Sequence, residues 1–125
     1  MDPTILVVDD DPDIRTLLRR VLGRAGYQVR EAADGVQALE EVASERPALV
    51  LADLMMPRMN GDALIAQLMH GADAIPCILM SAFHSQPPVE DVPFLPKPFA
   101  IGYLLELVAE TLERGTAVRH RSTRP

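Results

Sequence analysis

The chain has 125 residues, of which 48% are hydrophobic, and it carries a formal net charge of -6 at pH 7. Its length fits one domain with a substantial core, and its acidic balance argues against direct nucleic-acid binding and against binding to an anionic membrane. The sequence contains no apolar run long enough to span a membrane, and its acidic start does not resemble a secretory signal, so we expect a cytoplasmic protein.

Short strand-like runs alternate with longer segments of helical period. A helix is expected after each of the first three strands and after the last, and the strands are expected at residues 4–9, 27–32, 48–53, 75–82 and 92–95. This alternation predicts an α/β fold in which a doubly wound, five-stranded parallel sheet carries helices on both faces.

The expected helices have recognisable ends. Asp11 and Pro12 supply an N-cap and a first-turn proline, and Asp34 can cap the second helix. In the last helix apolar residues recur every three or four positions, and Gly115 is its expected C′ residue. We therefore expect a domain over residues 1–115 and a flexible basic tail or linker over residues 116–125.

The connection between the fourth and fifth strands breaks the pattern. Residues 82–92 are barely enough for a helical crossover, and Pro87 and Pro88 interrupt them. The sequence therefore predicts a short helical turn or a loop in place of a regular helix.

Polar residues stand where the expected strands end. Asp9 and Asp10 follow the first strand, Asp53 ends the third, Ser81 ends the fourth and Lys97 follows the fifth. In a doubly wound sheet, ligands gather at the carboxyl ends of the strands. Several carboxylates in one pocket repel one another unless a cation lies among them, and hard oxygen ligands suit Mg²⁺. The pattern favours a phosphoryl-transfer site.

Lys97 is the only lysine, because eleven of the twelve basic residues are arginines. Lysine is a compact point charge and arginine a wide planar fork, so we expect Lys97 to occupy a narrow pocket of opposing charge. The histidines His70, His84 and His120 show no metal-ligand spacing and no paired nucleophile, so none of them is expected to be functional.

Four fragments of the sequence, taken in order, resemble the receiver domains of two-component response regulators. They are VVDD (residues 7–10), LVLADLMMPRMNG (residues 49–61), LMSA (residues 79–82) and KPF (residues 97–99). Each fragment alone is weak evidence for the family, but four fragments in the family's order at strand ends are very specific to it. The resemblance covers about residues 4–114 and implies the strand order 2-1-3-4-5.

The resemblance also implies roles for the acidic residues. Asp53 is similar to the aspartate that accepts a phosphoryl group from a histidine kinase. Asp9 and Asp10 resemble the acidic pair that positions Mg²⁺ together with Asp53 and the backbone carbonyl of Met55.

Further roles follow from the same resemblance. Ser81 resembles the hydroxyl residue that meets the phosphoryl oxygens, and Lys97 resembles the lysine that contacts the phosphoryl group, with a cis peptide bond to Pro98. Phe94 resembles an aromatic residue that changes rotamer on phosphorylation, so Ser81 and Phe94 would form the switch. A phenylalanine in a short apolar strand is equally compatible with a core position.

A chain of this family is expected to be a signalling domain that assists only its own phosphorylation and dephosphorylation, and not an enzyme acting on other substrates. Its expected partners are a histidine kinase or phosphotransfer protein and an unnamed downstream protein, and it is expected to be a monomer or weak dimer. It would be a stand-alone receiver, part of a larger regulator, or the receiver of a hybrid kinase.

Two other functions remain open from the sequence. The fold could serve as a phosphorylation-independent binding module. A small Mg²⁺-dependent phosphatase of the haloacid-dehalogenase type also uses an aspartate nucleophile, but that family needs a second acid two positions later. Met55 stands at that position after Asp53, which disfavours the phosphatase.

Overall fold

A computed structural model of the chain describes residues 2–70, 73–84 and 88–122. Within these residues it contains a five-stranded sheet and four α-helices. The strands are β1 (Thr4–Val8), β2 (Gln28–Ala32), β3 (Leu49–Asp53), β4 (Cys77–Ser81) and β5 (Phe94–Pro96). The helices are α1 (Pro12–Arg24), α2 (Gly35–Ser44), α3 (Gly61–Leu68) and α4 (Ile101–Ser122).

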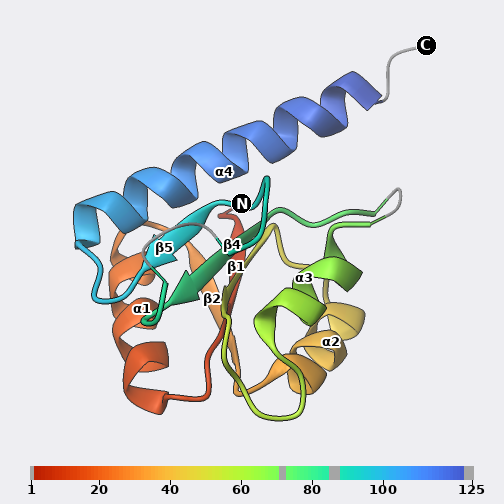
Figure 1. Ribbon diagram of the computed structural model, residues 1–125. Helices are drawn as coiled ribbons and strands as arrows, with labels where there is room; N and C mark the ends of the chain where they lie inside the picture. Colours follow the sequence, from red (N-terminus) through yellow and green to blue (C-terminus); the bar gives the residue numbers. More distant parts are fainter. Residues whose placement is uncertain (1, 71–72, 85–87, 123–125) are drawn as a thin grey trace.

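The sheet is parallel throughout, and its strand order is β2-β1-β3-β4-β5. Helices α1 and α4 cover one face, and α2 and α3 cover the other (Figure 1). Successive strand residues point to opposite faces, so the strands contribute side chains to two separate hydrophobic cores. Leu6 and Val8 pack toward α2 and α3, whereas Ile5 and Val7 pack toward α1 and α4. The predicted fold and strand order are therefore confirmed.

The first two helices begin where the sequence predicts. The side chain of Asp11 accepts a hydrogen bond from the backbone N–H of Asp13 at 2.9 Å, and Pro12 occupies the first turn of α1. The side chain of Asp34 accepts from the backbone N–H of Gln37 at 2.8 Å and caps α2. Each cap satisfies a backbone donor that has no partner within the helix.

The connection from β4 to β5 contains no helix among its described residues, 82–84 and 88–93. The loop predicted there is confirmed for those residues, whereas Pro87 lies outside the described part of the chain. Pro88 is described and half-buried. The edge of the sheet at β5 is therefore flanked by irregular backbone on one side and by α4 on the other.

The expected end of the last helix at Gly115 is wrong, because α4 continues to Ser122. A Cβ atom at Gly115 would lie 2.5 Å from the Cγ atom of Pro76. This glycine therefore permits a close approach of the helix to Pro76, and it does not end the helix. That residues 116–125 form a separate tail stays a prediction.

No helix in the described ranges is long and apolar enough to cross a membrane.

An ion pair ties the loop after β3 to the start of α2. The Nε and Nη2 atoms of Arg58 lie 2.9 and 2.8 Å from Oδ2 of Asp34, and Arg58 has a positive φ of 65°. The hydrogen bond from the Gln37 N–H lowers the pKa of Asp34, Arg58 lowers it further, and burial opposes both. One carboxylate thus caps a helix and holds a loop in a backbone conformation that is unfavourable for arginine.

Replacing Asp34 tests this double role. Asp34→Ala should lower the free energy of unfolding by about 1–2 kcal/mol at pH 7, because α2 loses its cap and Arg58 loses its partner. Asp34→Asn keeps a capping oxygen and should lose less. The pKa of Asp34 is lower in the folded state than in the unfolded state. Its charge therefore stabilises the fold above the unfolded pKa, and this stabilisation is lost as pH falls through the folded pKa.

Urea unfolding at pH 7 and below about pH 3 measures both effects. The difference between wild type and Asp34→Asn should shrink in acid. Equal stability of wild type and Asp34→Ala at pH 7 would contradict the assignment.

Candidate functional site

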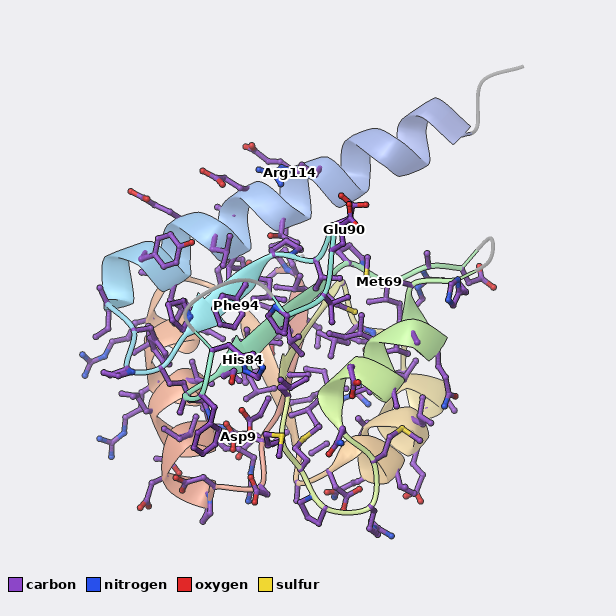
Figure 2. The ribbon with its side chains drawn as sticks, in the orientation of Figure 1. Asp9, Met69, His84, Glu90, Phe94 and Arg114 are labelled. Carbon is purple, nitrogen blue, oxygen red and sulfur yellow. The ribbon has the colours of Figure 1, made fainter. Side chains whose placement is uncertain are left out.

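The strand order places the predicted site residues beside one another. Strands β1, β3, β4 and β5 are consecutive in the sheet, and Asp9, Asp53, Ser81 and Lys97 stand at or just beyond their carboxyl ends. Figure 2 shows Asp9 and His84 at this end of the sheet, opposite the end where Met69 and Glu90 lie. The parallel fold thus brings together residues that are far apart in the sequence.

Lys97 forms the central contact of the site. Its Nζ atom donates a hydrogen bond to Oδ2 of Asp9 at 2.7 Å and lies 3.2 Å from Oδ1 of Asp53. Asp9 is 1% exposed and the Lys97 side chain 16% exposed. Lys97 thus lies between two carboxylates, the opposing charge that we expected around it.

The buried setting changes the proton affinity of two of these groups. Burial raises the pKa of Asp53, and the Lys97 ammonium opposes that shift. Burial works to lower the pKa of Lys97, but the hydrogen bond and charge of Asp9, together with Asp53, outweigh it and raise the pKa. Lys97 therefore stays charged, and the negative charge of Asp53 is costly wherever no further cation is present.

Asp9, Asp10 and Asp53 form an acidic group. One carboxylate oxygen from each residue lies within 4.8 Å of the others, and Asp9 and Asp53 are buried whereas Asp10 is exposed. Three hard oxygen donors with one side open to solvent fit Mg²⁺, which keeps several waters in its coordination shell. Met55 lies in the loop two residues beyond Asp53, and its backbone carbonyl as a fourth ligand stays a prediction.

Asp9 is fixed by several contacts. Its N–H donates to the Ala32 carbonyl at 3.1 Å, and its Oδ1 accepts from the Asp11 N–H at 2.9 Å. The Nη1 atom of Arg15 donates to the Asp9 carbonyl at 2.7 Å, and its Nε pairs with Glu31 at 3.2 Å. Sequence reasoning missed Arg15, because nothing in its spacing distinguishes it from the other arginines of α1.

Ser81 is also held in place. Its side chain is buried, its Oγ accepts a hydrogen bond from the Phe83 N–H at 3.1 Å, and the same Oγ lies 2.9 Å from Nδ1 of His84. His84 thus lies directly beside the predicted site residue Ser81, a position that its place in the sequence did not indicate. Among the other histidines, His70 lies exposed beyond α3, and the side chain of His120 lies outside the described residues.

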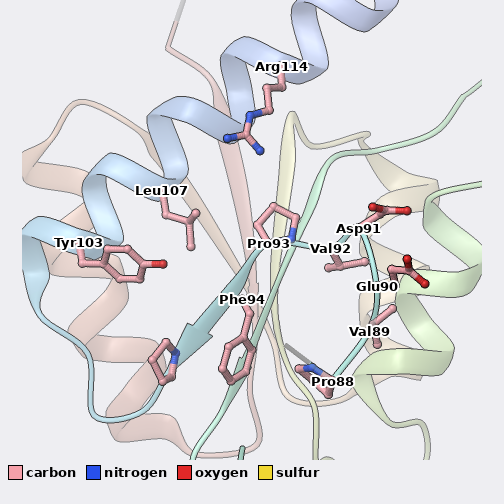
Figure 3. A pocket seen from close by; sticks show the side chains of 11 residues that line it. Pro88, Val89, Glu90, Asp91, Val92, Pro93, Phe94, Tyr103, Leu107 and Arg114 are labelled. Atoms are coloured by element: carbon pink, nitrogen blue, oxygen red, sulfur yellow. The ribbon is translucent and has the colours of Figure 1, made fainter. Parts of the chain in front are cut away.

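The segment from β5 to α4 supplies the remaining predicted residues. The Lys97 N–H donates to the Ser81 carbonyl at 2.9 Å, and the Lys97–Pro98 peptide bond is cis, as the resemblance implied. Phe94 is buried on β5, where it lines a pocket between the β4–β5 loop, with Pro88, and α4, with Tyr103 (Figure 3). Its position is compatible both with a switch and with core packing.

Comparisons with known proteins agree with this geometry. The family model of the response regulator receiver domain matches residues 5–109. The response regulator MprA of Mycobacterium ulcerans is 41% identical over 122 residues, which cover 91% of this chain and 52% of that protein. The chain thus spans about half the length of the curated relatives it matches.

Solved structures give the same result. The signal receiver domain of an HD domain-containing protein from Pseudomonas fluorescens Pf-5 matches with a TM-score of 0.83 and 26% identity, covering 94% of this chain and 99% of that chain. The chemotaxis protein CheY4 of Vibrio cholerae matches with a TM-score of 0.80 and 27% identity, covering 89% and 99% of the two chains.

Gly61 allows the loop after β3 to close tightly against the site. Its N–H donates to the Leu54 carbonyl at 2.8 Å, and a Cβ atom at Gly61 would lie 2.3 Å from the backbone oxygen of Asp53. Any side chain at this position must displace either the loop or the end of β3. The backbone around Asp53 therefore depends on this glycine.

Gly61→Ala should destabilise the protein by about 1–3 kcal/mol, because the added methyl group overlaps with backbone. The matched control is Gly23→Ala in α1, where a Cβ atom would meet nothing within 4 Å. We expect that variant to be neutral or stabilised by up to about 1 kcal/mol. Thermal and urea unfolding of both variants measure the difference, and equal effects would show that the close approach at Gly61 is relaxed easily.

Proposed function

The chain belongs to the response regulator receiver family, and from that premise we propose that it accepts a phosphoryl group on Asp53 from a histidine kinase or a phosphotransfer protein. The observation that carries the proposal is the convergence of Asp9, Asp10 and Asp53, with the ammonium group of Lys97 between Asp9 and Asp53. Phosphoryl transfer depends mainly on positioning and on neutralising charge, and this pocket supplies groups for both.

Asp53 is the proposed acceptor because it ends the central strand β3, lies beside Lys97 and is less buried than Asp9. Asp9 is almost fully buried and already engaged by Lys97, whereas Asp53 is 8% exposed and lies 3.2 Å from the same ammonium group. A carboxylate oxygen of Asp53 would bond to phosphorus as the bond from phosphorus to the donor imidazole breaks. The product is an acyl phosphate whose new negative charge lies beside Lys97.

The acidic residues would hold Mg²⁺, with Asp9, Asp10 and Asp53 as side-chain ligands and the Met55 carbonyl as a further one. When bound, this ion neutralises charge on the phosphoryl oxygens. Lys97 supplies the remaining positive charge, and the hydroxyl of Ser81 supplies a hydrogen-bond donor at the neighbouring strand end.

The phosphorylated protein would signal through Ser81, Phe94 and the β4–β5 loop. Ser81 and Phe94 lie on the neighbouring strands β4 and β5, and the described loop residues contain no regular helix that would resist a change in order. The downstream partner would be a protein, and the domain itself would act as a monomer or weak dimer in the cytoplasm. Catalysis would be limited to its own phosphorylation and dephosphorylation.

A receiver-like module that binds its partner without phosphorylation is the second candidate. It is supported by the same fold but makes no use of Lys97 or of the acidic group. Phosphorylation in solution therefore distinguishes the two functions directly.

Wild-type protein incubated with a small acyl phosphate or phosphoramidate and Mg²⁺ should gain one phosphoryl group, measured by intact mass. Asp53→Ala should gain none, and removal of Mg²⁺ by a chelator should abolish the reaction in wild type. Asp62→Ala, which removes an exposed acid in the first turn of α3, is the matched control and should react as wild type does. Unchanged phosphate gain in Asp53→Ala would refute the acceptor assignment.

Lys97→Arg should slow acyl phosphate formation by about tenfold or more, because charged hydrogen bonds of this kind are worth about 1.5–3 kcal/mol and the wider guanidinium cannot reproduce their geometry. The fold should be little changed. Arg114→Lys, at an exposed position of α4, serves as the control for the exchange of cations. A wild-type rate in the Lys97→Arg variant would remove the special role assigned to this lysine.

A further inference from the structure

The hydroxyl group of Ser81 connects the buried site to an exposed loop. Ser81 is 1% exposed, and the two partners that its Oγ has among the described residues lie within the next three positions: the Phe83 N–H at 3.1 Å and Nδ1 of His84 at 2.9 Å. Phe83 and His84 are themselves exposed. The contact therefore joins a group inside the site to a segment that other molecules can reach.

The available donors and acceptors determine which group donates in the hydrogen bond between Ser81 and His84. A serine hydroxyl has one proton to donate and two lone pairs to accept with, and the Phe83 N–H already occupies one lone pair. Buried hydroxyl protons are nearly always hydrogen-bonded. Of the two partners of this hydroxyl in the described structure, only Nδ1 of His84 can accept. In this arrangement the Ser81 hydroxyl donates its proton to Nδ1 of His84.

The same hydroxyl lies beside the proposed phosphorylation site. Met80 is the register partner of Asp53, so Ser81 is one residue beyond that pair, and its carbonyl accepts the Lys97 N–H at 2.9 Å. A phosphoryl group on Asp53 would bring only hydrogen-bond acceptors to this position. Its oxygens and Nδ1 of His84 would then compete for one proton.

We propose that His84 is a positioning residue that holds the hydroxyl proton of Ser81 in the unphosphorylated protein and loses it to the phosphoryl group when Asp53 is modified. The inference rests on the function proposed above and adds a regulatory contact to the same site. His84 thereby opposes the phosphorylated conformation, and its release loosens residues 82–84. Within the described part of the loop, the contact supplies one of the two hydrogen bonds that hold the Ser81 hydroxyl.

The expected change in affinity follows from the net free energy of one hydrogen bond. Such a bond changes an equilibrium constant by about twofold to tenfold. Removing the competing acceptor should therefore tighten the binding of a phosphoryl mimic at Asp53 by about that factor. A residue that only filled space in the loop would not produce a gain in affinity.

The experiment measures the affinity for beryllofluoride, a mimic of the phosphoryl group, in the presence of Mg²⁺ by NMR titration. His84→Ala should bind about twofold to tenfold more tightly than wild type. His84→Asn should restore wild-type affinity, because its side-chain oxygen can accept near the position of Nδ1. His84→Gln, which carries its amide one carbon farther out, should resemble His84→Ala. His70→Ala, an exposed histidine beyond α3, is the matched control and should leave the affinity unchanged.

A double-mutant cycle with Ser81→Ala isolates the contact. In the Ser81→Ala background, His84→Ala should have no further effect on affinity. Amide exchange gives a second readout: residues 82–84 of unmodified His84→Ala should exchange about as fast as those of wild type with the mimic bound. Equal affinities of wild type and His84→Ala, or the same gain in the Ser81→Ala background, would overturn the role of His84.

These outcomes are separate from failure of the proposed function. If wild type bound no beryllofluoride, or if Asp53→Ala bound it equally well, the assignment of Asp53 as the phosphoryl acceptor would be refuted. Binding that requires Asp53 but does not respond to His84 would overturn only the present inference.

Discussion

Three carboxylates share one pocket with a single ammonium group, and the surrounding structure holds this excess of negative charge in place. Asp9 and Asp53 are buried, so water screens their repulsion only weakly, and Lys97 bridges them at 2.7 and 3.2 Å. The parallel sheet makes this possible because its strand ends cannot move apart independently. Burial raises the pKa of Asp53 despite the lysine beside it, which leaves the pocket suited to a second cation.

Sequence reasoning could predict the fold and most of the site because both depend on local signals. Buried strands and amphipathic helices have different periods, and the polar residues directly follow the strands that position them. Two features lay outside such reasoning. Gly115 carries the usual signal of a helix end but serves a close approach to Pro76, which depends on packing between distant segments. His84 reaches Ser81 only through the path of an irregular loop, which no periodicity specifies.

The two loops at the carboxyl edge of the sheet are held in different ways. The loop after β3 is anchored by the Arg58–Asp34 ion pair and by the close packing of Gly61, so the backbone around Asp53 is fixed from two sides. The described start of the β4–β5 loop is held by the short-range contacts of the Ser81 hydroxyl. One loop is therefore built to keep its geometry, and the other can change its geometry when a single proton changes partner.

The continuation of α4 through Gly115 has a mechanical consequence. A helix of 22 residues is about 33 Å long. Among its described side chains Leu104, Val108 and Thr111 are buried, and Gly115 still closely approaches Pro76. In Figure 1 the far end projects beyond the sheet. The seven residues beyond Gly115 extend about 10 Å past this contact, so a tilt of about 5° about Gly115 moves the far end by only about 1 Å. A displacement of the helix beside β5 is thus passed to its far end with little amplification.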